Sequence, residues 1–153
     1  MEDLQTINDW TRQILKEYGI KTVAKLVAEL ERLNKNATGK LSESLNSEVV
    51  DFITNINLEF SAEHYVEYVV RGRLPGHFAP VQAIKDWCNV RGIDEALAYP
   101  INYKIYKFGI KPTPFIDNVF NQDESFDELI NELEDNYEQK IESYLENIFK
   151  IEN

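Results

Sequence analysis

The clearest pattern in the sequence is a helical stripe of apolar residues that begins at Phe126 and continues to Ile148. Its apolar residues recur every three or four positions, so one face of a helix would carry all of them. Ser125 fits the N-cap position, and Glu128 follows three residues later, as in a capping box. The pattern predicts a long amphipathic helix over residues 122–153, either packed on the rest of the chain or extending from it.

A second helical pattern lies at the start of the sequence. Apolar residues at three- and four-residue spacing predict a helix from Leu4 to Tyr18. Gly19 is expected to interrupt this helix, and a further helix is expected over residues 23–33. The polar stretch 34–39 then ends the helical region.

The period changes from helical spacing to alternation in the next segment. Ile56, Leu58 and Phe60 alternate with polar residues, and a weaker alternation covers residues 45–49. A short connection near Asp51 therefore predicts a β-hairpin. Because two strands alone are only marginally stable, we expect the hairpin to pack on helices or to pair with strands of a neighbouring subunit.

Shorter elements are expected in the middle of the chain. A short helix is expected after Ser61, and Pro80 is expected to begin a helix that ends at the Arg-Gly pair eleven and twelve residues later. A third helix should follow Asp94, with Pro100 causing a kink or a late start. The prolines in 111–115 predict an extended linker.

These elements predict an α+β fold, predominantly helical, in a single domain with a β-hairpin or small antiparallel sheet and a long acidic C-terminal helix. Residues 1–121 are expected to form the α+β body, and residues 122–153 the acidic helix. No run of 18 apolar residues exists, so we expect no membrane-spanning helix and no membrane partner. The first ten residues also lack the basic-then-apolar layout of a signal peptide.

The charge of the chain is unevenly distributed. The net charge is −11, and residues 122–153 contribute −9, from eleven acidic residues against two lysines. The remaining sixteen acidic and fourteen basic residues leave residues 1–121 at −2. Because an acidic surface repels phosphate, we do not expect the chain to bind nucleic acid specifically.

The sequence contains no arrangement of residues that predicts an active site, a metal site or a cofactor. His64 and His77 are too far apart for a zinc motif, and Cys88 is alone, which favours a small buried side chain. We therefore expect no catalytic residue, no metal and no cofactor. One enzymatic alternative remains, in which Glu63 and Glu67 act as an acid–base pair.

The segment 71–80 (RGRLPGHFAP) is the best candidate for a binding surface. Two glycines and two prolines exclude regular structure, and the loop also carries arginine and aromatic side chains. We interpret it as an assembly loop, although a surface loop pinned by its prolines is the alternative. The candidate subunit-interface residues are Arg71, Arg73, Pro75, His77 and Phe78. The candidate core residues are Tyr65, Ile84, Trp87 and Phe115.

Four segments occur in a characteristic order along the sequence. They are TGKLSES from Thr38 to Ser44, YVEYVVRGRLPG from Tyr65 to Gly76, PVQAIKDW from Pro80 to Trp87, and GIKPTPF from Gly109 to Phe115. In this order they resemble the tail-completion (neck, or head–tail joining) proteins of tailed bacteriophages. Pro100 departs from that family, because such proteins tend to continue an uninterrupted helix there, and the acidic C-terminal helix has no fixed counterpart in it.

The resemblance implies a structural virion protein, made in the host bacterial cytoplasm, that has no enzymatic activity. Its partners would be copies of itself in a six- or twelve-fold ring and neighbouring portal, adaptor or tail proteins. DNA would pass through the channel of the ring without specific binding. The acidic helix would either line the channel, where it would repel DNA, or face outward and dock another ring. The alternative is a virion adaptor or interaction module that binds a partner protein through its acidic C-terminal helix.

Overall fold

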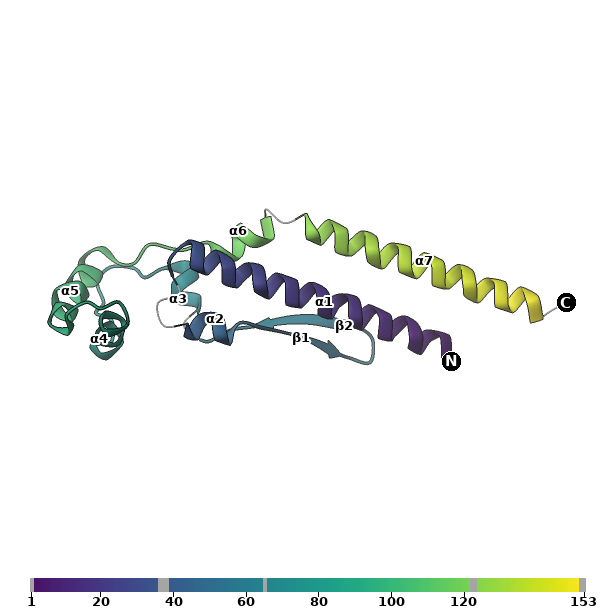
Figure 1. Cartoon of the computed structure of the whole chain (residues 1–153), viewed down its shortest axis with the longest axis horizontal. Helices are drawn as coiled ribbons and strands as arrows, with labels where there is room; N and C mark the ends of the chain where they lie inside the picture. The colour runs from purple at the N-terminus through teal and green to yellow at the C-terminus, as the bar shows by residue number, and fades with distance from the viewer. Residues whose placement is uncertain (1, 36–38, 65, 122–123, 152–153) are drawn as a thin grey trace. The chain divides into compact units, whose positions relative to one another are not determined.

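The computed structural model describes residues 2–35, 39–64, 66–121 and 124–151. Of these residues, 67% are helical, and two strands form an antiparallel sheet, so the predicted predominantly helical α+β class is confirmed. Figure 1 shows the elements in order: α1 (Glu2–Arg32), α2 (Lys40–Ser44), β1 (Asn46–Asp51), β2 (Ile56–Ser61), α3 (Val66–Arg71), α4 (Val81–Val90), the 3-10 helix η1 (Glu95–Leu97), α5 (Ala98–Phe108), α6 (Phe115–Asn121) and α7 (Ser125–Ile151).

The chain forms two compact units, and each unit combines segments that are far apart in the sequence. Unit 1 contains Met1–Ala24, Asn46–Phe60 and Phe120–Asn153, and unit 2 contains Lys25–Leu45 and Ser61–Val119. Contacts within each unit, rather than the order along the chain, therefore define these units. The separate role expected for the acidic C-terminal segment stays a prediction.

In unit 1 the hairpin packs closely against α1 at Gly19. The helix continues through this residue, so the predicted interruption is wrong. A Cβ atom at Gly19 would lie 2.7 Å from Ser47 Oγ and 2.9 Å from Leu58 Cδ1, which is closer than ordinary van der Waals contact. The missing side chain thus makes room for the hairpin. A 2.8 Å ion pair between Arg12 and Asp51 also joins α1 to the hairpin.

The helices α1 and α7 lie side by side and antiparallel in unit 1. Thr11 and Tyr137 form a 3.2 Å hydroxyl–hydroxyl hydrogen bond, and the Lys140 ammonium lies 5.3 Å from the centre of the Trp10 ring. The contacts therefore move toward the start of α1 as they advance along α7. The buried cluster between them consists of Ile14, Tyr18 and Leu129.

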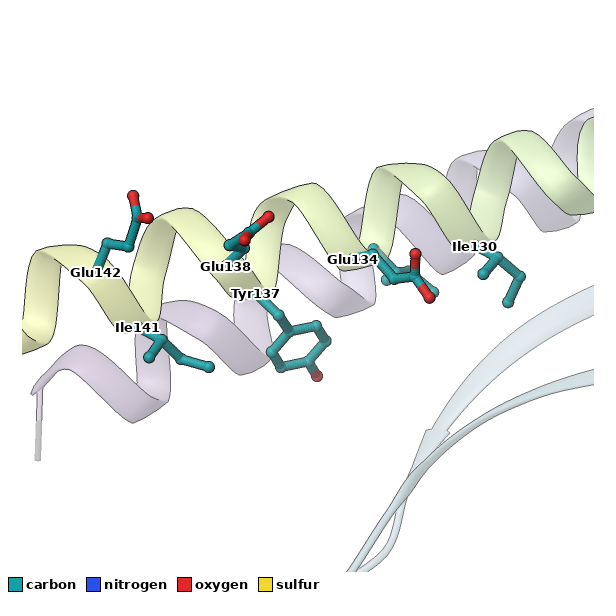
Figure 2. A pocket seen from close by; sticks show the side chains of 7 residues that line it. Ile130, Glu134, Tyr137, Glu138, Ile141 and Glu142 are labelled. Carbon is teal, nitrogen blue, oxygen red and sulfur yellow. The ribbon is translucent and has the colours of Figure 1, made fainter.

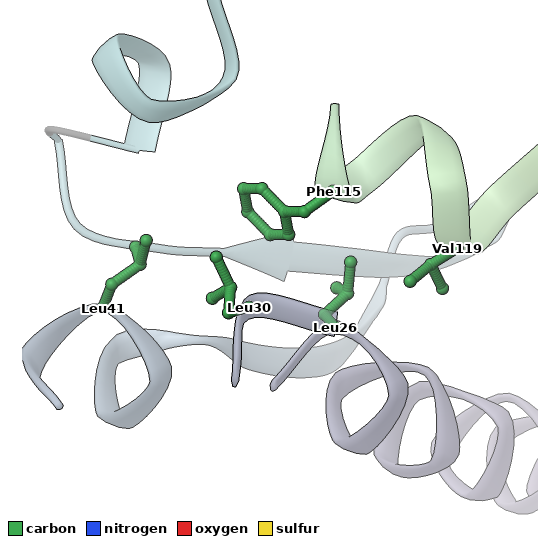
Figure 3. Close-up of a cluster of buried hydrophobic side chains, with 5 residues drawn as sticks. All are labelled: Leu26, Leu30, Leu41, Phe115 and Val119. Carbon is green, nitrogen blue, oxygen red and sulfur yellow. The ribbon is translucent and has the colours of Figure 1, made fainter. Parts of the chain in front are cut away.

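A buried apolar cluster forms the core of unit 2. It brings together the last turns of α1, the short helix α2 and the helix α6, as Figure 3 shows. Phe115 is fully buried, which confirms it as a core residue. The predicted extended linker is confirmed only as far as Pro114, because Phe115 already begins α6. The cluster consists of Leu26, Leu30, Leu41, Phe115 and Val119.

A polar cluster fastens α6 to the end of α1. The Glu29 carboxylate accepts hydrogen bonds from Arg32 at 2.6 and 2.7 Å and from the Asn118 amide at 2.8 Å. These bonds favour the ionised form, so they lower the pKa of Glu29 from 4.5 to about 2, with Arg32 as the larger cause.

Most of the remaining elements agree with the predictions. The hairpin is present, and its turn is closed by a 2.8 Å hydrogen bond from Phe52 N–H to the Asn55 carbonyl. The helix α4 follows Pro80 directly, and α5 begins at Ala98, so that Pro100 lies in its first turn and the late start is confirmed. The helix expected directly after Ser61 begins only at Val66.

Candidate interaction surfaces

The loop of residues 72–80 is ordered by contacts with α5 and with the segment that follows α5. Arg73 and Ile110 form an antiparallel bridge, in which each backbone N–H donates to the other residue's carbonyl, at 2.9 and 2.8 Å. Gly76 N–H donates to the Tyr106 carbonyl at 2.7 Å. The glycines and prolines therefore shape a fixed loop that contacts its own chain at several points.

Two glycines allow the backbones to approach closely at this bridge. Both Gly72 and Gly109 have positive φ angles, of 72° and 71°. A Cβ atom at Gly72 would lie 2.3 Å from the Ile110 carbonyl oxygen, and one at Gly109 would lie 2.1 Å from the Arg73 carbonyl oxygen. Neither position has room for a side chain, so glycine is required on both sides of the bridge.

A buried asparagine holds the other end of the loop. The Asn102 amide accepts a 2.8 Å hydrogen bond from Ala79 N–H and donates a 2.9 Å hydrogen bond to the Ala79 carbonyl. Only 4% of the Asn102 surface is exposed. This clamp was not expected, because in the sequence Asn102 resembles any polar residue within a helical pattern.

An exposed aromatic strip runs from the loop onto α5. The Phe78 ring stacks on Tyr106 with ring centres 4.5 Å apart, and Tyr103 follows at 6.4 Å from Tyr106. The exposed fractions of Phe78 and Tyr103 are 56% and 58%. Tyr99 is also exposed, and its helical spacing places it on the same side of α5 as the other two tyrosines. We call these four residues, Phe78, Tyr99, Tyr103 and Tyr106, the α5 strip.

The predicted interface residues of the loop differ in what they contact. Arg71 is exposed, and its guanidinium lies 3.1 Å from the equally exposed Glu67 carboxylate. Arg73 is half-buried and donates from Nη2 to the Phe78 carbonyl at 2.9 Å, so it supports the loop from within. Pro75 and His77 are exposed. Their role between subunits stays a prediction.

Basic side chains border the α5 strip. Residues 96–116 contain three lysines and no acidic residue. These lysines, Lys104, Lys107 and Lys111, are all exposed. At 100° per residue, Lys107 lies about 70° around α5 from the tyrosines, and Lys104 lies about 130° from them in the same direction. An aromatic strip with a row of positive charge along one side is therefore open to solvent.

A second open surface lies on α7 in unit 1. An open groove of about 720 Å³ follows this helix, and Figure 2 shows Ile130, Tyr137 and Ile141 projecting from one side while Glu138 and Glu142 project from an adjoining side. Ile141 is 53% exposed, although the sequence pattern places it on the apolar face. We call this surface, lined by Ile130, Leu133, Glu134, Tyr137, Glu138, Ile141 and Glu142, the α7 groove.

The packing on α1 explains why the apolar face of α7 stays open. Leu129 is buried, and Leu133 is half-buried against the same cluster, so α7 turns these residues toward α1. The stripe that dominates the sequence pattern also contains Phe126, Ile130 and Ile141, which are exposed. The helix is thus packed along one edge of its apolar face, and the other edge is exposed.

The carboxylates of the α7 groove form a regular row. Glu134, Glu138 and Glu142 are spaced four residues apart and therefore lie along one side of the helix. Within the part of the chain that the structure describes, no hydrogen bond or ion pair involves these three side chains. Their negative charge is therefore available to an outside partner.

The other predicted core residues have different outcomes. Cys88 is fully buried, as expected, and Ile84 is half-buried on the same helix. Trp87 is 37% exposed, and Arg91 lies over its ring at 5.9 Å, so its assignment to the core is wrong for this chain on its own. The reason is that α4 points Cys88 inward, and Trp87 lies about 100° around the helix from it. Tyr65 lies outside the described residues.

The residues considered for catalysis are not brought together as a site. Glu67 pairs with Arg71, whereas Glu63 lies beside Lys40, Glu43 and Ser44, and both carboxylates are exposed. Among the residues described, no group of three or more His, Cys, Asp or Glu side chains is placed to hold a metal ion. Likewise, no helix in the described ranges is long and apolar enough to cross a membrane.

The structure brings together segments that carry the resemblance noted in the sequence. Leu41 from the first segment and Phe115 from the fourth lie in the same buried cluster. The second and fourth segments meet at the bridge between Arg73 and Ile110. No protein-family model, no curated protein and no solved structure matches the chain.

Proposed function

We propose that this chain is a non-enzymatic structural protein of a tailed bacteriophage. In this proposal its copies form a ring in the neck or tail of the virion, joining the portal-proximal connector to tail components. DNA passes through the ring without specific binding. The ring binds neighbouring portal, adaptor or tail proteins and requires no cofactor.

The observation that carries this proposal is the amount of large apolar surface left open on three elements. The α7 groove and the α5 strip are two of these surfaces, and Phe52 and Ile53 at the hairpin turn form a third. Exposed apolar groups in such numbers favour association with other proteins. A ring subunit needs two different contact surfaces, one for each neighbour, and further surface for the next component of the particle.

The meeting of the resembling segments in unit 2 supports the choice of family. Gly72 in the second segment leaves room for the Ile110 carbonyl of the fourth segment. Gly109 in the fourth segment leaves room for the Arg73 carbonyl of the second segment. Three of the four segments therefore pack together, which is more consistent with one inherited structural unit than unrelated matches would be.

The decisive test is to look for the chain in virions made by the genome that encodes it. We expect mass spectrometry of gradient-purified particles to find the chain at a fixed ratio to the portal protein. A cryo-EM map of the neck should then show a ring into which unit 1 and unit 2 fit as separate bodies. A chain that is abundant in infected cells but missing from purified particles would refute the proposal.

A loop variant tests the assembly role assigned to residues 71–80. Arg71→Glu should block ring formation and leave the circular dichroism spectrum unchanged, because Arg71 contacts only an exposed carboxylate in its own chain. Arg73→Glu is a poorer test, since Arg73 also supports the loop through the Phe78 carbonyl. Normal rings formed by Arg71→Glu would remove Arg71 from the interface.

The α7 groove favours one alternative function, that of a virion adaptor which binds a single partner protein. Deleting residues 122–153 would not test it cleanly, because Leu129 belongs to the core of unit 1. Ile130→Ser combined with Ile141→Ser changes two exposed side chains of the groove and leaves the hydrogen bond between Thr11 and Tyr137 in place. An adaptor would be present in particles without forming a ring of its own, and this pair of changes would remove it from them.

A further inference from the structure

The α5 strip and the α7 groove are alike in form and opposite in charge. Each surface is an exposed apolar or aromatic band on one helix with a row of charged side chains along one side. The row beside the groove is three carboxylates, and two ammonium groups, those of Lys104 and Lys107, lie beside the strip on α5. Complementary charge of this kind orients partners and suppresses wrong pairings.

We propose that the α7 groove of one copy of this chain binds the α5 strip of a second copy. The proposal rests on the ring function above and names the two surfaces that meet in it. Tyrosines from α5 would enter the groove between Ile130 and Ile141. The lysines beside them would face Glu134, Glu138 and Glu142.

The two surfaces have similar lengths. The eleven residues of α5 span about 16 Å, and the thirteen residues of the groove from Ile130 to Glu142 span about 20 Å at 1.5 Å per residue. A helix laid in a groove of matching length is a common mode of protein recognition, with anchors at helical spacing. Tyr99, Tyr103 and Tyr106 have that spacing.

The positions of the charges also fix the direction of the contact. At 100° per residue, the row of carboxylates on α7 is centred about 80° around the helix from its apolar band. On α5, Lys107 lies about 70° and Lys104 about 130° around the helix from the tyrosines. Both displacements have the same sense when each helix is viewed from its N-terminus. Two helices that pack face to face then bring these charges together only when they run antiparallel.

A second copy fits these surfaces better than the other possible occupants. Nucleic acid is repelled by the carboxylate row of the groove. Two α7 grooves placed together would oppose like charges, and two α5 strips would do the same. Pairing of α5 with α7 also leaves one free strip and one free groove on every dimer, so the contact can repeat around a closed ring.

Charge reversal on each surface tests the proposal. We would measure self-association of the full chain by sedimentation velocity. Glu134→Lys with Glu138→Lys, and separately Lys104→Glu with Lys107→Glu, should each weaken association at least about tenfold at 0.1 M salt. Placing all four changes in one chain should restore it, because every contact again joins opposite charges. An equimolar mixture of the two double variants should also associate.

The control is Glu128→Lys with Glu132→Lys, which makes the same charge change on the opposite side of α7 and should leave association unchanged. Failure of the four-fold variant to recover would overturn the proposal, as would self-association that the reversals do not weaken. A chain that stays monomeric at millimolar concentration would overturn it as well. None of these results bears on the presence of the chain in virions, so the proposed function stands or falls separately.

Discussion

Replacing Gly109 with alanine should destabilise unit 2 well beyond the cost of an unfavourable backbone conformation. At φ 71° and ψ −165° the backbone lies in a region essentially confined to glycine, so an alanine there is strained by about 1–2 kcal/mol, partly offset by a less flexible unfolded chain. The new Cβ would also lie 2.1 Å from the Arg73 carbonyl oxygen, which is a backbone atom and cannot rotate away. The segments must separate, and the two hydrogen bonds between Arg73 and Ile110 are then lost.

The magnitude follows from these two contributions. Strain in the positive-φ region leaves a net cost of about 1 kcal/mol. Two backbone hydrogen bonds contribute about 1 kcal/mol each. Gly109→Ala should therefore lower the free energy of unfolding by about 3 kcal/mol. Gly92→Ala is the matched control, because Gly92 has a φ of 65° in the same unit but nothing lies within 4 Å of its Cβ position.

The assay is urea denaturation followed by tryptophan fluorescence. In a Trp10→Phe background the remaining indole, Trp87, belongs to unit 2 and reports its unfolding. We expect Gly92→Ala to cost about 1 kcal/mol and Gly109→Ala about 2 kcal/mol more. A difference between the two variants of less than about 0.5 kcal/mol would show that the close approach at the bridge does not constrain residue 109.

Three further predictions concern other contacts. Gly19→Ala should destabilise the chain although alanine favours a helix by about 1 kcal/mol, because its Cβ meets Ser47 and Leu58. Ser47→Gly removes one of these two contacts and should recover part of the loss in urea denaturation. The Glu29 carboxyl should titrate near pH 2 by carbon-13 NMR, and Asn118→Ala should raise this pKa. Because the pKa of Glu29 in the folded chain lies below 4.5, the ionised carboxylate stabilises the fold above pH 4.5, and this stabilisation is lost as the pH falls toward 2. Asn102→Asp should lower the free energy of unfolding by about 2–4 kcal/mol at pH 7. The loss should be smaller at pH 4, where a buried carboxyl becomes neutral, and it is measured against wild type at each pH.

Each of these predictions has a clear contrary result. A stabilised Gly19→Ala variant would mean that the hairpin does not touch α1 at this residue. An unchanged Glu29 titration after the loss of Asn118 would remove the amide as a cause of the low pKa. Equal costs of Asn102→Asp at both pH values would indicate that the amide geometry matters and the carboxylate charge does not.

The helical periodicity and the turn residues were enough to predict the hairpin, the late start of α5, and the long helix at residues 125–151. They failed where a residue acts through a distant segment. Gly19 has the sequence signal of a helix break, but its purpose is to make room for Ser47 and Leu58. Local pattern alone cannot distinguish these cases, because the deciding contact is made by residues more than 25 positions away.

The candidate surfaces were predictable in part for the same reason. Composition correctly marked residues 72–80 as an irregular loop, although Arg71 is the last residue of α3, and the support from Asn102 and Ile110 comes from elsewhere in the sequence. The stripe on α7 was correctly read as helical, although periodicity could not say which of its edges would pack on α1. That edge is selected by Leu129 and Leu133.

The interleaving of the two units affects the order in which the chain can fold during synthesis. All segments of unit 2 leave the ribosome before residue 120, whereas unit 1 needs both the first helix and the last one. Domains generally fold as they emerge, so the α5 strip is formed before the α7 groove has been translated. In the proposed pairing of strip with groove, two nascent copies therefore cannot join one another until at least one of them has released α7.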